Sequence, residues 1–266
     1  MPTIASTRMF GRITQRVSKS LGLYYRAAEA KEKRFRSKRL RFYAQFVKND
    51  SLCFDIGAHF GNRTDVFLAL GAKVVAVEPQ VDCVRYLKKK YRNNANVTVI
   101  PRGLDSAAGR RVIRLCDSNG ASTMSEEWLE SVKMSGRFGA LRWRGSQEVE
   151  VTTLEDLVSQ FGCPAFCKID VEGFELQVIR GMATPIPRLS FEFTPEIINP
   201  TIEAIHHLAK AGDYKFNYSF GESMEFASKT WLSQGDIRLA LENLPDKKVF
   251  GDVYAKMRVD GVVDEN

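Results

Sequence analysis

The sequence is poor in the residues that build metal centres and disulfide frameworks. Its 266 residues include three histidines and five cysteines, and the cysteine count is odd. Cys163 and Cys167 stand one residue too far apart for a C-x-x-C motif. A structural zinc site is therefore not expected. Unpaired cysteines are typical of a reducing compartment, so we expect a cytoplasmic protein.

Long hydrophobic runs are also missing. No apolar stretch approaches the ~18 residues that a membrane-spanning helix needs, and the N-terminal region lacks the continuous apolar segment of a secretory signal. Hydrophobic residues make up 44% of the chain and charged residues 27%, which is ordinary globular usage. The length allows one large or two small domains.

Acidic residues are scarce near the N-terminus, where the first is Glu29. Residues 1–50 hold 13 Lys or Arg against 3 Asp or Glu, whereas residues 51–266 hold 26 against 29. Apolar positions between Phe10 and Tyr24 recur at helical spacing. We therefore expect residues 1–50 to form a basic helical arm that packs on the body. Binding of the arm to an anionic membrane surface or another polyanion, and a mitochondrial-type transit segment, are the alternatives.

From Leu52 onward, short apolar strands alternate with amphipathic helices. Strands are expected at Leu52–Ile56, Val74–Val77, Val97–Ile100, Ala165–Ile169, Leu189–Phe193, Tyr214–Tyr218 and Val253–Met257. Helices are expected at Asn62–Leu70, Val81–Arg92, Leu154–Phe161, Phe174–Arg180, Pro200–Lys210 and Asp236–Asn243. Repeated strand–helix units predict an α/β fold with a parallel sheet. We interpret residues 51–259 as one domain, residues 103–144 within it as an insertion or β-hairpin, and residues 260–266 as a tail.

Ligands of such sheets bind at the carboxyl ends of the strands, so the residues that follow each strand are candidates for a site. The first strand leads into a loop with Gly57 and Gly61, and a helix that starts near Asn62 offers free N–H groups to an anion. The G-x-x-x-G spacing does not match the G-x-G-x-x-G of dinucleotide-binding proteins. Glu78 follows the second strand, and its two oxygens suit the two hydroxyls of a ribose. A loop-capping role before Pro79 is the alternative.

Carboxylates also follow two later strands. Asp170 and Glu172 lie two residues apart, so in an extended chain they project to the same side. Such a pair can act as general base, bind a substrate hydroxyl or hold a divalent cation, or it can serve the turn and the next helix. Glu192 alternates with two phenylalanines and either faces the other side of the sheet or takes part in the site. His59, in the first loop, could reach a substrate proton, although a lone histidine is more often structural.

Together these motifs resemble the FkbM family of class I S-adenosylmethionine-dependent methyltransferases. The loop FDIGAHFGN resembles the first motif of the family, and residues 77–79, VEP, resemble the second. The most specific stretches are TLEDL at 153–157 and KIDVEGFE at 168–175. Residues 251–255, GDVYA, are similar to the closing strand of the family. The resemblance covers residues 52–257 and leaves the basic arm aside.

This resemblance implies a Rossmann-like sheet of seven strands, mostly parallel with the last strand antiparallel, and S-adenosylmethionine as cofactor. By position, Asp55, Gly57, Ala58, Gly61 and Asn62 would approach the methionine portion, Glu78 the ribose, and Gly103 or Asp105 the adenine. The family also implies O-methylation of a sugar or another small molecule. The acceptor would then be a small molecule or a glycan.

For the chemistry, we expect Asp170 to take the proton of the acceptor hydroxyl, with Glu172 or His59 as alternative bases. A divalent cation bound by Asp170 and Glu172 could instead acidify that hydroxyl. The basic arm makes a nucleic-acid methyltransferase the nearest alternative enzyme, but the body is mildly acidic and has no N-P-P-Y-like run. An inactive methyltransferase-like interaction module is the other alternative, and the intact glycine loop, Glu78 and Asp170 argue against it.

Overall fold

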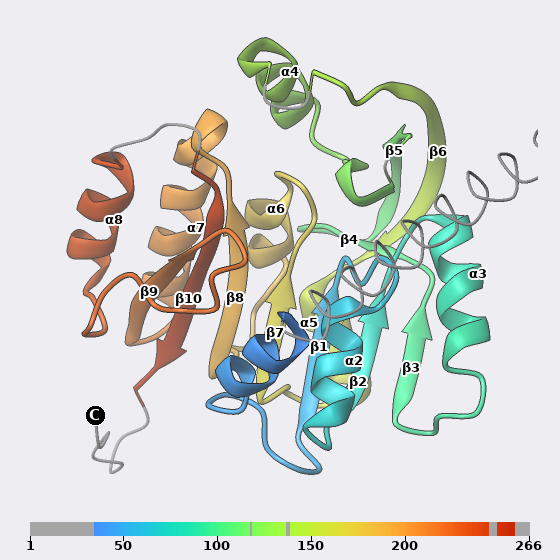
Figure 1. Cartoon of the computed structure of the whole chain (residues 1–266), viewed down its shortest axis with the longest axis horizontal. Coiled ribbons are helices and arrows are strands. Elements are labelled where there is room, and N and C mark those ends of the chain that lie inside the picture. The colour runs from blue at the N-terminus through green and yellow to red at the C-terminus, as the bar shows by residue number, and fades with distance from the viewer. Residues whose placement is uncertain (1–34, 118, 137–138, 245–248, 259–266) are drawn as a thin grey trace, which may run out of the picture. The chain divides into compact units, whose positions relative to one another are not determined.

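The computed structural model describes residues 35–117, 119–136, 139–244 and 249–258 (Figure 1). The chain divides into a first unit, Met1–Arg41, and a second unit, Phe42–Asn266. In the first unit, residues 35–41 are helical. The helix expected between Phe10 and Tyr24 and the expected tail lie outside the described residues. None of the helices in the described part of the chain combines the length and the apolar composition that crossing a bilayer requires.

A seven-stranded sheet forms the centre of the second unit. Its strands, in spatial order, are β3 (Val97–Ile100), β2 (Lys73–Val77), β1 (Leu52–Ile56), β7 (Phe166–Ile169), β8 (Arg188–Phe193), β10 (Gly251–Met257) and β9 (Tyr214–Phe220). Neighbouring strands from β3 to β8 are parallel, whereas β10 runs antiparallel to β8 and to β9. The expected mostly parallel sheet with an antiparallel last strand is confirmed.

Helices cover both faces of this sheet (Figure 1). On one face lie α2 (Asn62–Ala69) and α3 (Val81–Lys90), which connect β1, β2 and β3. The other face is covered by α5 (Leu154–Phe161), α6 (Glu175–Arg180), α7 (Ile198–Ala211) and α8 (Gln234–Glu242), whose apolar side chains share one core cluster with the strands. Thr153 caps α5: its hydroxyl accepts the backbone N–H of Asp156, and the Asp156 carboxylate accepts the backbone N–H of Thr153.

The interval between β3 and β7 forms a second sheet of three strands. Within it, β6 (Trp143–Thr152) lies between β4 (Gly103–Leu104) and β5 (Gly109–Cys116). The connection from β5 to β6 contains the 3-10 turn η1 (Asn119–Ala121) and α4 (Glu126–Ser135). The sequence gives no clear signal for β6, because most side chains in the first half of β6 are exposed and its apolar alternation is confined to the end.

The two faces of the central sheet differ in character. The face under α5 to α8 is apolar, as Phe54, Ile169 and Phe191 illustrate. The opposite face carries buried polar side chains that lie in register across five strands. In order they are Asp55 (β1), Lys168 (β7), Ser190 (β8), Tyr254 (β10) and Asn217 (β9). We call this set the polar row.

Aromatic rings cover the polar row. Tyr43 and Phe46 lie with their ring centroids 5.7 and 4.9 Å from the ring of Phe166, which projects to the same face as Lys168. Phe67 of α2 contacts the same ring at 5.8 Å. The polar row is therefore enclosed by hydrophobic surface and shielded from solvent, so each of its charges needs a partner within the protein.

Candidate functional site

The topology predicts where a ligand binds. From β1 the chain builds β2 and β3 on one side of the sheet and later β7 and β8 on the other, so the strand order reverses beside β1. Ligands of open α/β sheets bind at such a switch point, at the carboxyl ends of the strands. A cleft of about 500 Å³, partly open to solvent, lies there. It is lined by Gly57, His59, Glu78, Gly103, Asp170 and Glu172, together with residues of the three-stranded sheet and its connection.

Gly57 brings the loops after β1 and β7 into contact. Its φ is +80°, and its N–H donates to the carbonyl of Val77 at 2.9 Å. A Cβ atom at this position would lie 1.9 Å from the backbone oxygen of Asp170, which no real side chain tolerates. Only glycine combines this backbone conformation with this approach. The Asp170 backbone therefore forms one wall of the glycine loop.

Glu78 is buried at the carboxyl end of β2, with 2% of its surface exposed. Its Oε2 accepts the backbone N–H of His59 and its Oε1 that of Gln80, both at 2.9 Å. Burial raises the pKa of Glu78, and hydrogen bonds from the backbone of Gln80 and His59 and from the side chain of Gln80 oppose that rise. A carboxylate has about four acceptor positions, so these three bonds hold Glu78 rigidly and leave room for a further donor.

The remaining residues expected near the cofactor do not line the cleft. Asp55 is buried and accepts a hydrogen bond from Thr64 at 2.5 Å, which fastens β1 to α2. Burial also raises the pKa of Asp55. Asp105 is buried too, and its carboxylate bonds the guanidinium of Arg111 and the backbone N–H of Ser106. The other three are Ala58, Gly61 and Asn62, in the loop and at the start of α2.

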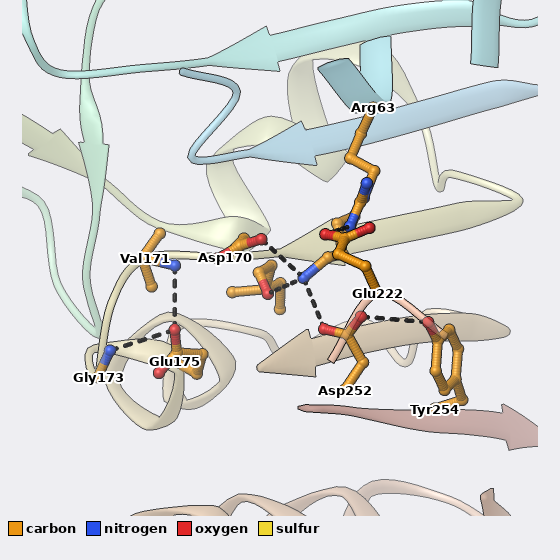
Figure 2. A network of polar contacts seen from close by, with 10 residues as sticks. Arg63, Asp170, Val171, Gly173, Glu175, Glu222, Asp252 and Tyr254 are labelled. Carbon is orange, nitrogen blue, oxygen red and sulfur yellow. Dashed lines mark hydrogen bonds and ion pairs between the residues drawn. The ribbon is translucent and has the colours of Figure 1, made fainter. Parts of the chain in front are cut away.

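Asp170 follows β7, and Lys168 holds its carboxylate. The Lys168 ammonium lies 3.1 Å from Asp170 Oδ2 and 2.9 Å from Asp252 Oδ1, and it donates to the carbonyl of Ile169 at 3.2 Å (Figure 2). The side chain of Lys168 is 1% exposed, whereas that of Asp170 is 35% exposed. Burial would lower the pKa of Lys168, but the two carboxylates raise it well above its usual range, so the ammonium is charged.

Three carboxylates meet beside the cleft. Asp170, Glu172 and Glu192 bring one oxygen each within 4.8 Å of the others. The extended backbone that the sequence predicts here is wrong, because Glu172 has a φ of +54°. The turn brings the two side chains together all the same. Thr123 donates to the Glu172 carbonyl at 2.6 Å, which ties the three-stranded sheet to this turn.

Glu192 lies on the polar face of the sheet, directly opposite Asp252 of β10. Its position confirms that it faces away from the core that holds Phe191 and Phe193. Burial raises the pKa of Glu192 well above its usual range, and the charges of Glu172 and Asp170 add to that rise. Its Oε2 is buried and has no hydrogen-bond partner among the described residues. The raised pKa favours the protonated carboxyl, and a protonated carboxyl can donate to a ligand oxygen.

His59 lines the same cleft. Its φ is +49°, and its backbone N–H is the donor that holds Glu78. Burial lowers the pKa of the imidazole, although Asp170 opposes the shift, so the ring is neutral at neutral pH. Its Nε2 is buried without a hydrogen-bond partner in the described part of the chain. The imidazole can thus accept or donate a proton at the edge of the cleft.

Three residues of the site were not predicted from the sequence to have a role in it. Lys168 stands in an otherwise apolar strand, and this anomaly is the signal that could have found it. Asp252 gives no such signal, because an aspartate at the start of an expected strand is typical of a loop. Glu175 is the third: its Oε1 accepts the backbone N–H groups of Val171 and Gly173, and burial raises its pKa to about 7 (Figure 2).

Comparison with known proteins places these features in context. The family model of the methyltransferase FkbM domain matches residues 55–244. No curated protein matches the chain. A precorrin-6Y C5,15-methyltransferase from Geobacter metallireducens is similar in structure, with 10% identity, a TM-score of 0.44 and coverage of 84% of this chain and 87% of that one. A TehB-like SAM-dependent methyltransferase from Corynebacterium glutamicum has 9% identity, a TM-score of 0.41 and coverage of 91% and 99%.

Proposed function

We propose, because the chain belongs to the FkbM family of class I S-adenosylmethionine-dependent methyltransferases, that it methylates a hydroxyl group of a sugar or another small molecule. The observation that carries the proposal is the alignment of Glu78, Gly57 and Asp170 around one cleft. Glu78 supplies a rigidly held carboxylate, Gly57 lets the backbone approach a ligand, and Asp170 offers a second carboxylate beside both.

The residues present fit the cofactor of the family. Glu78 would bind the ribose hydroxyls, the loop that begins at Gly57 would lie along the methionine portion, and Gly103 would lie near the adenine. S-adenosylmethionine supplies, when bound, a methyl group on a sulfonium ion. The chain has to align the acceptor oxygen with that methyl group, which is chiefly an orientation effect.

Asp170 is the proposed base. Its Oδ2 is engaged by Lys168, and its Oδ1 has no protein partner among the described residues. Oδ1 would take the proton of the acceptor hydroxyl, an effect worth ~10²–10⁴-fold in rate. Glu172 and His59 line the same cleft and are the alternative bases. Glu192 would donate from its protonated carboxyl to another oxygen of the acceptor.

A divalent cation shared by Asp170, Glu172 and Glu192 is the alternative way to acidify the hydroxyl. The spacing of their oxygens allows it. The ammonium of Lys168 weighs against it, because it already supplies a positive charge 3.1 Å from Asp170. Cytoplasmic location, and contact of the basic arm with an anionic membrane or polyanion, remain parts of the proposal that rest on the sequence.

The first experiment is isothermal titration of the full chain with S-adenosylmethionine, S-adenosylhomocysteine and NADH. Micromolar binding of the first two and none of NADH is expected. Glu78→Ala should abolish that binding, whereas Glu203→Ala, at an exposed ion pair with Arg180, should leave it unchanged. Absence of binding in a folded sample would sink the methyltransferase proposal.

The second experiment tests the acceptor. Transfer of tritium from S-adenosyl-[methyl-³H]methionine is measured with a panel of methyl glycosides of hexoses, 6-deoxyhexoses and uronic acids. The proposal predicts base-stable incorporation into at least one of them. A methyl ester would be lost in alkali, so alkali-labile product would refute O-methylation of a hydroxyl.

A further inference from the structure

We infer that Lys168 is a positioning residue of the transfer reaction: it grips one oxygen of Asp170 so that the other faces the acceptor. This inference rests on the proposed function, because Asp170 is the base in that reaction. Lys168 is the first residue of the KIDVEGFE stretch at 168–175, but neither composition nor spacing gives it a function of its own. The assignment comes from the contacts of its ammonium group and from what holds those contacts in place.

Three oxygens surround the ammonium group. It donates hydrogen bonds to Asp252 Oδ1 at 2.9 Å and to the Ile169 carbonyl at 3.2 Å, and it forms an ion pair with Asp170 Oδ2 at 3.1 Å. The two hydrogen bonds hold the nitrogen within reach of the Asp170 carboxylate. The side chain is 1% exposed, and water therefore cannot replace any of the three acceptors.

Asp252, the second carboxylate partner of Lys168, is itself held in place. Asp252 is 5% exposed, and both of its oxygens are occupied, Oδ1 by Lys168 and Oδ2 by the hydroxyl of Tyr254 at 3.2 Å (Figure 2). Asp252 and Tyr254 lie on β10, which pairs with β8 and β9 on its two sides. The ammonium is thus anchored to the antiparallel strand and reaches across the polar face to Asp170.

Asp170, at the carboxyl end of β7, is constrained at its backbone and at one side-chain oxygen. Its N–H donates to the carbonyl of Ile56 at 2.9 Å, and its own carbonyl packs against Gly57. The backbone thus fixes where the side chain starts, and Lys168 fixes which way the carboxylate turns. Oδ1 is the oxygen left over, and the side chain belongs to the lining of the cleft.

Energetics favour a functional reason for this buried cation. Enclosing a lysine and an aspartate costs desolvation that their attraction only about repays, and well-packed apolar residues are often as stable. The aromatic surface around the polar row would accept such residues. A charged pair that gives little stability, but points one carboxylate into the cleft, is explained by the geometry it imposes on Asp170.

The test replaces the charged pair as a unit. Removing Lys168 alone would leave Asp252 buried and unpaired, a change expected to destabilise the fold. The variant Lys168→Met/Asp252→Asn removes both charges and keeps the shapes. Its matched control is Lys215→Met/Asp213→Asn, which makes the same substitutions at a partly exposed pair at the start of β9. Crystal structures with S-adenosylhomocysteine give the position of Asp170, and titration gives the cofactor Kd.

In the Lys168 variant, the Asp170 carboxylate should turn away from its wild-type position while the cofactor Kd changes less than about threefold. With the glycoside that the wild type methylates, kcat should fall about 10²-fold, the effect of misplacing a reacting group. The control should match the wild type in all three measurements. An Asp170 carboxylate that stays in place in the variant overturns the inference, as does an unchanged kcat. Should the wild type methylate no glycoside, a sugar acceptor is refuted, and the crystal structures still decide whether Lys168 positions Asp170.

Discussion

Glu175 is the buried acid whose replacement gives the sharpest test of the electrostatics at this site. The carboxyl is 7% exposed, and burial raises its pKa from 4.5 to about 7, with Asp170 raising it further and Lys168 lowering it. Glu175→Gln keeps an oxygen that can accept the N–H groups of Val171 and Gly173. The substitution therefore removes the ionisation and retains the hydrogen bonds that shape the turn.

The sign of the effect follows from proton linkage. Below pH 4.5 the carboxyl is protonated in the folded and the unfolded chain, so it contributes no difference. Above pH 7 both states are ionised and the folded state carries the full burial penalty. The shift from 4.5 to about 7 corresponds to roughly 3 kcal/mol. The free energy of unfolding of the wild type should therefore lose about 3 kcal/mol relative to Glu175→Gln between pH 4.5 and 7.

Urea unfolding at pH 5, 6, 7 and 8 measures this difference. With an m-value of about 3 kcal/mol/M, the midpoint of Glu175→Gln should exceed that of the wild type by roughly 1 M at pH 8, and by little at pH 5. Glu203→Gln, an exposed acid in a surface ion pair, is the matched control and should show no pH-dependent difference. A midpoint difference for Glu175→Gln that stays constant from pH 5 to 8 would refute the reasoning.

Three further outcomes are expected. Asp170→Asn should lower turnover by ~10²–10⁴-fold with little change in the affinity for S-adenosylmethionine, and preserved turnover would remove Asp170 from the role of base. Added EDTA should leave methyl transfer unchanged, and a loss that Mg²⁺ restores would favour the cation alternative. Gly57→Ala should destabilise the fold by several kcal/mol in thermal unfolding, from backbone strain and the clash with Asp170, whereas Gly109→Ala, with no atom within 4 Å of the new Cβ, should not.

The fold was predictable because its signals are local. Each parallel strand is a short run of β-branched or aromatic residues, and each helix shows a 3.6-residue period that ends at a glycine or a polar residue. Thr153 and Asp156 form a capping box that marks the start of α5 within four residues. In β6 the signal fails, since its first half is a solvent-exposed ribbon whose partner β5 is also largely exposed.

The site was predictable only in part. Gly57, Glu78 and Asp170 could be found because topology alone brings the carboxyl ends of β1, β2 and β7 together. Lys168 and Asp252 could not be paired in advance, since 84 residues separate them and their contact depends on the register of two strand pairings. The left-handed backbone conformation of Glu172 could not be predicted either, because at a glutamate it reflects tertiary contacts rather than an intrinsic preference.

The antiparallel strand therefore has a role that its place at the end of the chain does not suggest. A parallel sheet reaching β8 would suffice to assemble Gly57, Glu78 and Asp170, but Lys168 would then lack Asp252 as its second carboxylate partner. β10 inserts between β8 and β9 and carries Asp252 to the ammonium of Lys168. Because this contact requires the register in which β10 pairs with β8, the position proposed for the Asp170 carboxylate depends on the antiparallel strand as well as on the parallel ones.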